Sequence, residues 1–385
     1  MRRFWERVTE GFELEQLWGQ FLTEARASYG LYSEDVDWAA IGRETKRWKR
    51  PFLVSWALFQ AMLMKLAPAR RVLLLLALVL LIFHIWSPTR AVNLGWFGAA
   101  ILFLLLALEL ADRVTMKRDL EIAREIQQWL VPAHPPQIPG VDIAFATLPQ
   151  NTIAGDYYDA FLRPTPNASG THPLLIAVAD VAGKSVPAAL LMATFQASLR
   201  ALSATPATLE ENVVGLDRYA REHSMGGRRF TTAFLAEIDP VKREMRHINA
   251  GHNAPVLLRA SGDVERLSAV GPPLGLPIFD GTETFYCANS IELQAGDLLF
   301  VFTDGVVEAV DENDEDFGEE RLLSCLRGSC HDAAAEVLKK VMAEVSRFVG
   351  YTRQHDDITC LVFRLNDQVP DAVPASPFHA TAIPS

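Results

Sequence analysis

The stretch LLIAVADVAGKSVPAALLMATF, from Leu174 to Phe195, joins an apolar run to a helical pattern through a glycine turn. The apolar run predicts a buried strand that ends in a carboxylate, Asp180. Gly183 then allows a tight turn, and we expect a helix with Ser185 as its N-cap residue and Pro187 in its first turn. An isolated Asp at such a place is usually a turn former, so the importance of Asp180 depends on whether the same design recurs.

The Gly-Lys-Ser triplet at 183–185 also resembles part of a nucleotide-binding loop. A P-loop requires a further glycine at position 178, because its backbone N–H groups curl around phosphates without a side chain in the way. The sequence has Val178 there, and a strand residue does not open that turn. We therefore reject a nucleotide-binding kinase or ATPase.

The design does recur, because an apolar run meets a turn at an aspartate in four places. These are AGDYYDAF with Asp156 and nearby Asp159, VADVAGKS with Asp180, LLFVFTDGVVEA with Asp304, and QHDDITCLVF with the adjacent pair Asp356 and Asp357. Each one alone is best explained as a turn former, but the strands of one core would aim all of them at a common centre. Four such places in one domain favour a shared site for hard cations.

The type of ligand indicates the chemistry. Carboxylates without a Cys or His cluster suit Mg²⁺ or Mn²⁺ rather than zinc. Acidic groups gathered within a few ångströms repel one another strongly unless cations neutralise them. Two ions bridged by carboxylates lower the pKa of a bound water and orient it for in-line attack on phosphorus. This pattern predicts phosphoester hydrolysis without a covalent intermediate.

Composition excludes other classes of function. The chain has 385 residues, enough for more than one domain, and a formal net charge of −11 from 36 Lys and Arg against 47 Asp and Glu. Nucleic-acid binding needs a basic footprint, so we expect no nucleic-acid partner. The four cysteines form no Cys-x-x-Cys pair, which favours a reducing compartment over a disulfide framework.

Short β-rich runs and turn signals alternate in the second half of the chain, with helices between them. Expected strands are Phe230–Asp239, Met245–Gly251, Ala254–Arg259, Val264–Leu267, Ile291–Leu293 and Leu298–Phe302, and expected helices are Ser185–Ser203, Glu319–Leu326 and Asp332–Phe348. Hairpins grouped around helices favour an α+β sandwich over a doubly wound parallel sheet.

The first third of the chain carries a predicted membrane region, residues 51–112. Two apolar runs give transmembrane helices at about 72–87 and 94–111, joined by SPTRAVN, and both lie too deep in the chain for a cleaved signal peptide. Basic residues flank both outer ends, so both ends and the following domain should face the cytoplasm, as in a multi-pass protein of the cytoplasmic membrane. The preceding run, Pro51–Ala67, is expected to lie in the interface. The alternatives are a third span and, less favoured, a buried core hairpin.

A linker helix is expected between the membrane region and the remaining domain, within residues 113–138. Ile122, Ile126 and Trp129 form an apolar stripe that needs burial by pairing or docking. The Pro-rich VPAHPPQIPG ends this helix and marks a boundary near Pro139. Residues 139–366 then form the catalytic domain, 1–50 a helical cytoplasmic segment and 367–385 a disordered Pro/Ala/Ser-rich tail.

Eight motifs together resemble those of the SpoIIE/RsbU-type bacterial serine phosphatases, of the metal-dependent protein phosphatase (PPM) superfamily. The motifs are AREIQQWLVP, AGDYYDAF, VADVAGKSVPAALLMA, FTTAF, NAGHNAP, GPPLGL, GDLLFVFTDGVVEA and QHDDIT. The resemblance covers roughly Ala123–Leu365 and implies two antiparallel sheets packed together with helices outside. It also implies phosphoserine or phosphothreonine protein substrates, typically anti-sigma-factor antagonists, and a linker helix that forms a homodimer and controls assembly of the metal site.

The resemblance also implies roles for individual residues. Asp156 and Asp180 would bind two Mn²⁺ or Mg²⁺ ions, joined by the backbone carbonyl of Val181, and Asp304 and Asp356 would complete the site. Asp357 is the alternative to its neighbour.

Four further positions in the motifs have implied supporting roles. Gly183 and Gly305 would allow the turns. His252 and Asn253 would be structural or lie behind the ligands, with an acid role for His252 less favoured.

The chain departs from the family pattern at two places. Ser185 stands where the family usually has Gly, and Ile153-Ala154 stands where it often has Val-Gly. Neither change removes a metal ligand, so we expect activity to survive. The competing hypothesis is an inactive scaffold with the same fold that binds a partner.

Overall fold

A computed structural model describes residues 47–86, 94–166, 171–223, 229–276, 286–350 and 354–367, together with six isolated residues: Tyr29, Ser33, Val36, Trp38, Ile41 and Thr352. The chain divides into two compact units, Met1–Met116 and Lys117–Ser385. Most of the predicted segment 1–50, the predicted tail and the SPTRAVN connection lie outside the described residues.

The first unit contains a helical hairpin. After η1 (Arg47–Lys49) and α4 (Arg50–Lys65) come α5 (Pro68–Trp86) and α6 (Leu94–Leu130), and α5 and α6 are both long and apolar enough to cross a membrane. A side chain at Gly98 would approach Leu81 Cγ to 2.9 Å and the Ala77 carbonyl oxygen to 3.0 Å, so α5 and α6 pack closely through small residues. No break separates the second apolar run from the predicted linker, because both belong to the single helix α6.

Two five-stranded antiparallel sheets form the centre of the second unit. Sheet A has the order β1-β10-β9-β6-β7, and sheet B has the order β2-β3-β4-β5-β8. Sheet A contains β1 (Val141–Leu148), β6 (Val256–Leu258), β7 (Val264–Arg266), β9 (Leu298–Phe302) and β10 (Ile358–Leu365). Sheet B contains β2 (Tyr157–Leu162), β3 (Leu174–Val181), β4 (Thr231–Asp239), β5 (Glu244–Ala250) and β8 (Asn289–Glu292).

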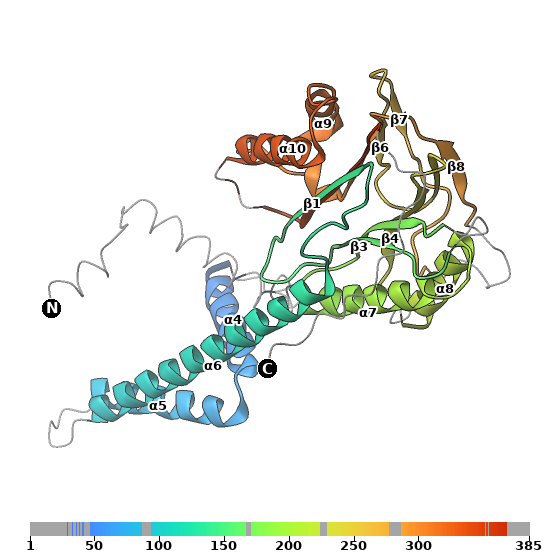
Figure 1. Cartoon of the computed structure of the whole chain (residues 1–385). Coiled ribbons are helices and arrows are strands. Elements are labelled where there is room, and N and C mark those ends of the chain that lie inside the picture. The colour runs from blue at the N-terminus through green and yellow to red at the C-terminus, as the bar shows by residue number, and fades with distance from the viewer. Residues whose placement is uncertain are drawn as a thin grey trace, which may run out of the picture. The chain divides into compact units, whose positions relative to one another are not determined.

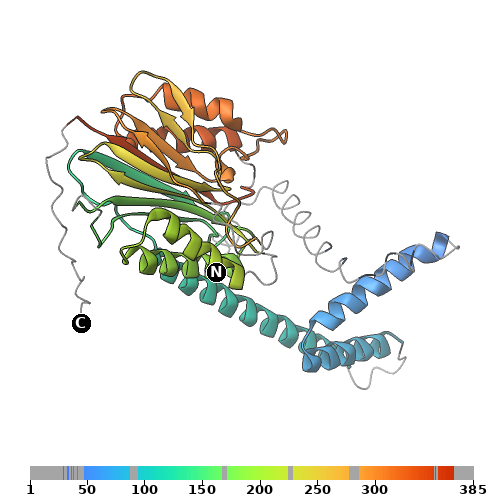
Figure 2. The same cartoon turned by 90° about the vertical axis from the view of Figure 1, so that its right-hand side faces the viewer.

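The two sheets stack face to face, and helices cover their outer faces (Figures 1 and 2). Helices α7 (Val186–Ser203) and α8 (Leu209–His223) pack on sheet B, and α9 (Gly318–Arg327) and α10 (Ala334–Val349) pack on sheet A. Strand β3 is apolar throughout because both of its faces are buried. Ile176 packs between the sheets, whereas Leu175 packs under α7 and α8. This four-layer α+β sandwich confirms the predicted fold class.

Most predicted elements are present, with differences at four places, the first of which is strand β1, which was not predicted. Helix α8 was not predicted, although Thr208 and Glu211 form a reciprocal capping box before its apolar positions, with N–H···O distances of 3.2 and 2.7 Å. Strands β8 and β9, which correspond to the expected Ile291–Leu293 and Leu298–Phe302, lie in different sheets and form no hairpin with each other. Ser185 occupies the N-cap position of α7, but its side chain makes no capping hydrogen bond, so the predicted role of its hydroxyl is wrong.

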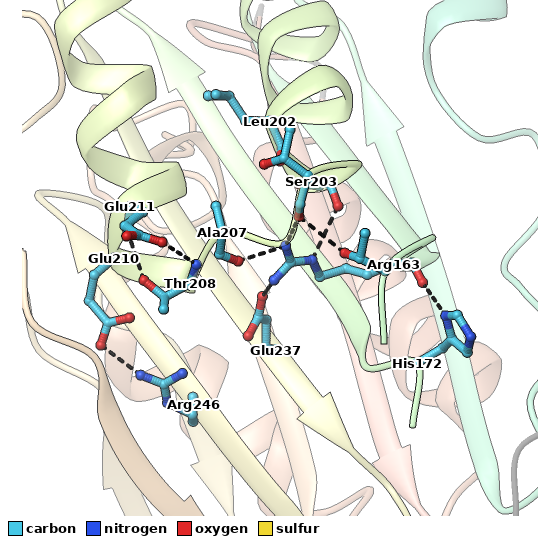
Figure 3. A network of polar contacts seen from close by, with 12 residues as sticks. Arg163, His172, Leu202, Ser203, Ala207, Thr208, Glu210, Glu211, Glu237 and Arg246 are labelled. Atoms are coloured by element: carbon cyan, nitrogen blue, oxygen red, sulfur yellow. Dashed lines mark hydrogen bonds and ion pairs between the residues drawn. The ribbon is translucent and has the colours of Figure 1, made fainter. Parts of the chain in front are cut away.

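A buried arginine fastens the α7–α8 connection at one end of sheet B (Figure 3). Arg163 follows β2, donates to the carbonyl oxygens of Ser203 at 3.2 Å and Ala207 at 2.8 Å, and pairs with Glu237 of β4. A cavity of about 430 Å³ lies here. The guanidinium is already engaged by these partners, and the candidate metal-binding aspartates lie at the opposite end of the strands, so we assign this cluster a structural role.

Candidate metal centre

Antiparallel pairing explains why distant aspartates meet at one end of the sandwich. In sheet B, Asp156 precedes β2 and Asp180 ends its neighbour β3, since Tyr157 pairs with Ala179. In sheet A, Asp304 follows β9 and the Asp356-Asp357 pair precedes β10, since Cys360 pairs with Phe302. Strands β2 and β10 begin, and strands β3 and β9 end, at the same end of the sandwich, as the recurrent strand-turn pattern predicted.

Asp156 is held at the junction of the two sheets. Its side chain is 5% exposed, and Thr303 of sheet A donates from Oγ1 to Asp156 Oδ2 at 3.0 Å. Burial raises the pKa of Asp156 well above its ordinary value, and the charges of Asp180 and Asp357 add to the rise. The carboxyl therefore lies in an environment that disfavours an uncompensated negative charge.

Asp180 is surrounded by the other acidic groups. Burial, followed by the charges of Asp304, Asp356 and Asp357, raises its pKa to about 7, although a hydrogen bond with Asp156 acts in the opposite direction. Asp180 therefore lies within electrostatic range of each of the other four predicted carboxylates.

Asp304 and Asp356 occupy the more open side of the centre. Asp304 begins η2 (Asp304–Val306), and its pKa is raised by burial and then by the charges of Glu308 and Asp356. The ammonium of Lys184 lies 3.1 Å from Asp356 Oδ2 and also donates to the His355 carbonyl oxygen at 2.5 Å. A lysine of the β3–α7 turn thus neutralises part of the negative charge.

The Asp357 carboxylate binds backbone amides. Its two oxygens accept the N–H groups of Gln150 and Gly155, both at 2.7 Å. Burial raises the pKa of Asp357, and these two hydrogen bonds oppose the rise. With both carboxylate oxygens bound to amides, Asp357 holds the loop before β2, whereas Asp356 accepts the Asp357 N–H through Oδ1 at 2.9 Å and faces Lys184 through Oδ2.

Two glycines of the centre are needed for different reasons. Gly183 has φ +119°, and a Cβ there would lie 1.6 Å from Arg229 Nη1, so the predicted turn does require glycine. Gly305 has no positive φ, but a Cβ there would lie 2.1 Å from the Asp357 carbonyl oxygen. Gly305 is needed for the close approach of two backbones and not for the turn, which corrects the expectation.

Ser185, which stands where the family usually has Gly, has a strained backbone conformation. Ser185 has φ 66° and ψ −149°, a region that glycine occupies easily and other residues at a cost. The substitution leaves the carboxylates in place.

The carbonyl of Val181 lies close to the loop that carries Asp156. A Cβ on Gly155 would approach the Val181 carbonyl oxygen and Ala188 Cβ to 3.2 Å. Asp159, in contrast, is buried on the helix side of β2, where it accepts the Tyr157 hydroxyl at 2.6 Å and both Arg200 nitrogens at 2.8 Å. Asp159 therefore anchors α7 and does not belong to the acidic centre.

His252 lies in the core behind the centre. Its Nδ1 is 3.0 Å from Thr232 Oγ1, and burial lowers its pKa to about 4. A neutral imidazole at neutral pH is a poor proton donor, which favours the structural role over the acid role. Asn253 is half-buried beside it.

The donor set fits hard divalent cations. Carboxylate oxygens are the ligands of Mg²⁺ and Mn²⁺. The raised pKa values of Asp156 and Asp180 reflect burial first and mutual repulsion second, and bound cations would compensate both. Within the described residues, no three His, Cys, Asp or Glu side chains form a ready-made metal site. Thr303, Lys184 and backbone amides contact the carboxylates instead. The roles of Thr303 and Lys184 could not be predicted, because a Thr or Lys beside an Asp forms no recognisable motif.

Comparison with known proteins identifies the family. The family model described as Stage II sporulation protein E (SpoIIE) matches residues 170–366, just over half of the chain. The chain belongs to the SpoIIE family. It is thus a member of the PPM-type serine phosphatases, as its motifs predicted.

Two curated proteins illustrate the relationship. Protein IcfG of Synechocystis sp. is 28% identical over 74% of this chain, but the match spans only 48% of IcfG, about half its length. Phosphoserine phosphatase RsbU of Bacillus subtilis is also 28% identical, over 65% of this chain and 70% of RsbU.

Solved structures agree on the fold. The SiaA-PP2C domain of Pseudomonas aeruginosa superposes with a TM-score of 0.56 at 22% identity, covering 66% of this chain and 99% of that domain. The RsbU and RsbW domains of Rv1364c from Mycobacterium tuberculosis give a TM-score of 0.51 at 22% identity, covering 63% and 64%.

Proposed function

We propose that this SpoIIE-family chain is a metal-dependent phosphatase of phosphoserine or phosphothreonine in a regulatory protein. One observation carries the proposal: aspartates from four separate segments meet at one end of a β-sandwich, within range of one another's charge. Uncompensated burial of several carboxylates is costly, so such a cluster implies a cationic ligand.

Asp156, Asp180, Asp304 and Asp356 would hold two Mn²⁺ or Mg²⁺ ions, with the Val181 carbonyl as a further ligand. Asp357 is the less suitable ligand, because both its oxygens accept backbone amides. Divalent ions bound there would supply a water molecule activated for attack on phosphorus and would neutralise charge on the phosphate.

The chain's own residues arrange this chemistry. Thr303 fixes one oxygen of Asp156, and Asp357 fixes the loop that carries Asp156. A cavity of about 150 Å³ lies beside the acidic centre, lined by residues that include Gly305, Glu308 and Asp356. We propose that the segment flanking the phosphorylated residue binds there.

The proposed substrate is an anti-sigma-factor antagonist of a partner-switching pathway. The similarity to a protein named phosphoserine phosphatase RsbU supports this class of substrate, as does the likeness of fold to RsbU and RsbW domains joined in one chain.

We further propose that the phosphatase is tethered to the cytoplasmic membrane by α5 and α6 and regulated through the C-terminal part of α6. Ile122 is 46%, Ile126 51% and Trp129 82% exposed, so the apolar stripe is open for pairing with a second copy. Polar substitutions at Ile122 and Ile126 should weaken dimerisation and change the activity of the full-length protein. Unaltered dimerisation, activity and regulation would overturn this part of the proposal.

Hydrolysis of p-nitrophenyl phosphate by the full-length protein tests the proposed activity. We expect Mn²⁺-dependent turnover that falls at least about 100-fold in Asp180→Asn and Asp304→Asn. Asp263→Asn, on an exposed hairpin, is the matched control and should retain activity. If neither this substrate nor phosphoproteins are hydrolysed in the presence of Mn²⁺, the competing hypothesis of an inactive scaffold is favoured.

A further inference from the structure

The cavity of about 150 Å³ beside the acidic centre shares two residues with that centre. Gly305, which follows Asp304, and Asp356 both line it, and further walls come from the end of β1 and the C-terminal half of α10. An extended peptide advances about 3.3 Å per residue. A peptide whose phosphorylated residue lies at the centre would therefore bring a neighbouring side chain to this cavity.

Helix α10 gives the cavity an apolar wall. Met342, Val345 and Val349 line it, and their spacing of three and four residues places them on one face of the helix. Val345 is 2% exposed, whereas Met342 and Val349 are only half-buried against the core of sheet A. Leu148, the last residue of β1, lines the same cavity and is 48% exposed. Apolar surface is thus left uncovered next to the candidate metal centre.

Two polar side chains of the lining are bound to other groups. Gln354 donates from Nε2 to the carbonyl oxygens of Leu148 at 2.7 Å and Asp356 at 2.6 Å, and the Asp356 carboxylate faces Lys184 at 3.1 Å. Glu308, also in the lining, adds an exposed negative charge. An acidic side chain would be repelled by this charge and would lose its hydration, so the cavity favours an apolar side chain.

The volume of the cavity agrees with this chemistry. An apolar cavity of about 150 Å³ is large enough for a benzene molecule, so the side chain of leucine, isoleucine, methionine or phenylalanine fits. Met342 adds adaptability to the wall, because its flexible thioether side chain fills irregular gaps.

We propose that this cavity is a specificity pocket that binds an apolar side chain close to the phosphorylated serine or threonine of the substrate protein. Met342 and Val349 contact that side chain and set the preference. The inference rests on the proposed function, because the phosphate must lie at the acidic centre for the neighbouring side chain to reach the pocket.

Phosphoserine peptides test the pocket in the full-length protein with Mn²⁺. Each peptide has an alanine background and carries Leu, Lys or Asp, or no change, at one position within two residues of the phosphoserine. Met342→Asp places a charge in the wall, and Met342→Ala removes its contacts without adding a charge. Ala343→Asp is the matched control, because Ala343 is exposed at the next position of α10.

At the position that faces the pocket, wild-type kcat/KM should be at least about tenfold higher for Leu than for Ala, which corresponds to about 1.4 kcal/mol. The Lys and Asp peptides should not exceed the Ala peptide. The Leu-to-Ala ratio should fall below about threefold in both Met342 variants and stay unchanged in Ala343→Asp. A general loss of activity cancels in this ratio, and Met342→Ala decides the question if Met342→Asp does not fold.

Cross-linking gives a second measurement that needs no turnover. The unphosphorylated peptides carry a photoreactive diazirine leucine at each of the same positions, and mass spectrometry maps the site of attachment. We expect attachment within residues 342–349 from at least one position, and attachment only elsewhere would overturn the inference.

A Leu-to-Ala ratio near one at every position, a preference for Lys over Leu, or a ratio that survives in both Met342 variants would overturn the inference and leave the proposed function intact. A wild-type protein that hydrolyses neither p-nitrophenyl phosphate nor any phosphopeptide would overturn the proposed function. The cross-linking result would still show whether the pocket binds an apolar side chain.

Discussion

Substitution of Gly305 by alanine gives a sharp test of the geometry of the centre. The added Cβ would lie 2.1 Å from the Asp357 carbonyl oxygen and 3.0 Å from its carbonyl carbon, whereas ordinary contact begins at 3.4 Å. The obstacle is backbone on both sides, so the Asp304 turn and the Asp357 loop must separate by about 1 Å. A misplacement of that size costs about 100-fold in rate, or about 2.7 kcal/mol of transition-state stabilisation. Overpacking of the fold should cost about 1–3 kcal/mol in addition.

Steady-state kinetics with p-nitrophenyl phosphate and a thermal unfolding curve measure the two effects in the same preparation. Gly328→Ala is the matched control, because a Cβ there meets its nearest neighbours, the Ser324 and Cys325 carbonyl oxygens, at 3.5 and 3.6 Å. The control should keep kcat/KM within about twofold of wild type. If Gly305→Ala behaves like Gly328→Ala, the close approach of the two loops described above is wrong.

Three further changes have predictable results. Ser185→Gly should raise the free energy of unfolding by about 1 kcal/mol by relieving the backbone strain at φ 66°, while Ser185→Ala, which keeps a Cβ, should give no such gain in a denaturant titration. Lys184→Met removes the ammonium 3.1 Å from Asp356 and should tighten Mn²⁺ binding about fivefold by calorimetry; weaker binding would contradict the assignment of Lys184 as a competing cation. Burial lowers the pKa of His247 to about 4, so the unfolded chain binds the proton more tightly and stability falls as the pH drops from about 6.5 to 4. His247→Leu should reduce that loss by about 1–3 kcal/mol, and an unchanged difference between denaturation at pH 7 and pH 5 would disprove this origin.

The sequence predicted the aspartates of the centre because each follows or precedes an apolar run. Strand period and turn residues carry that information locally, and antiparallel pairing then brings Asp180 and Asp304 to the same end of their sheets. The fold class followed from the same hairpins. These features depend on residues that are neighbours in the sequence, so one amino-acid sequence is enough to predict them.

The interactions that hold the centre depend on contacts between distant segments. Gly305 looked like a turn glycine, because nothing in Thr-Asp-Gly reveals that the Asp357 carbonyl lies against it. Thr303 is separated from its partner Asp156 by 147 residues. Gln127 of α6, whose side chain donates to the Ala154 carbonyl oxygen, is 27 residues from Ala154. No local pattern connects either pair. Helix α8 is a different case, because its capping box of Thr208 and Glu211 is a local pattern that the sequence itself contains.

The most direct test of the account is calorimetric titration of Mn²⁺ into the metal-free, full-length protein. We predict binding of two ions per chain, with affinity at least about tenfold weaker in Asp180→Asn and unchanged in Asp263→Asn. Equal Mn²⁺ binding by wild type and Asp180→Asn would contradict the claim that these aspartates form a metal centre.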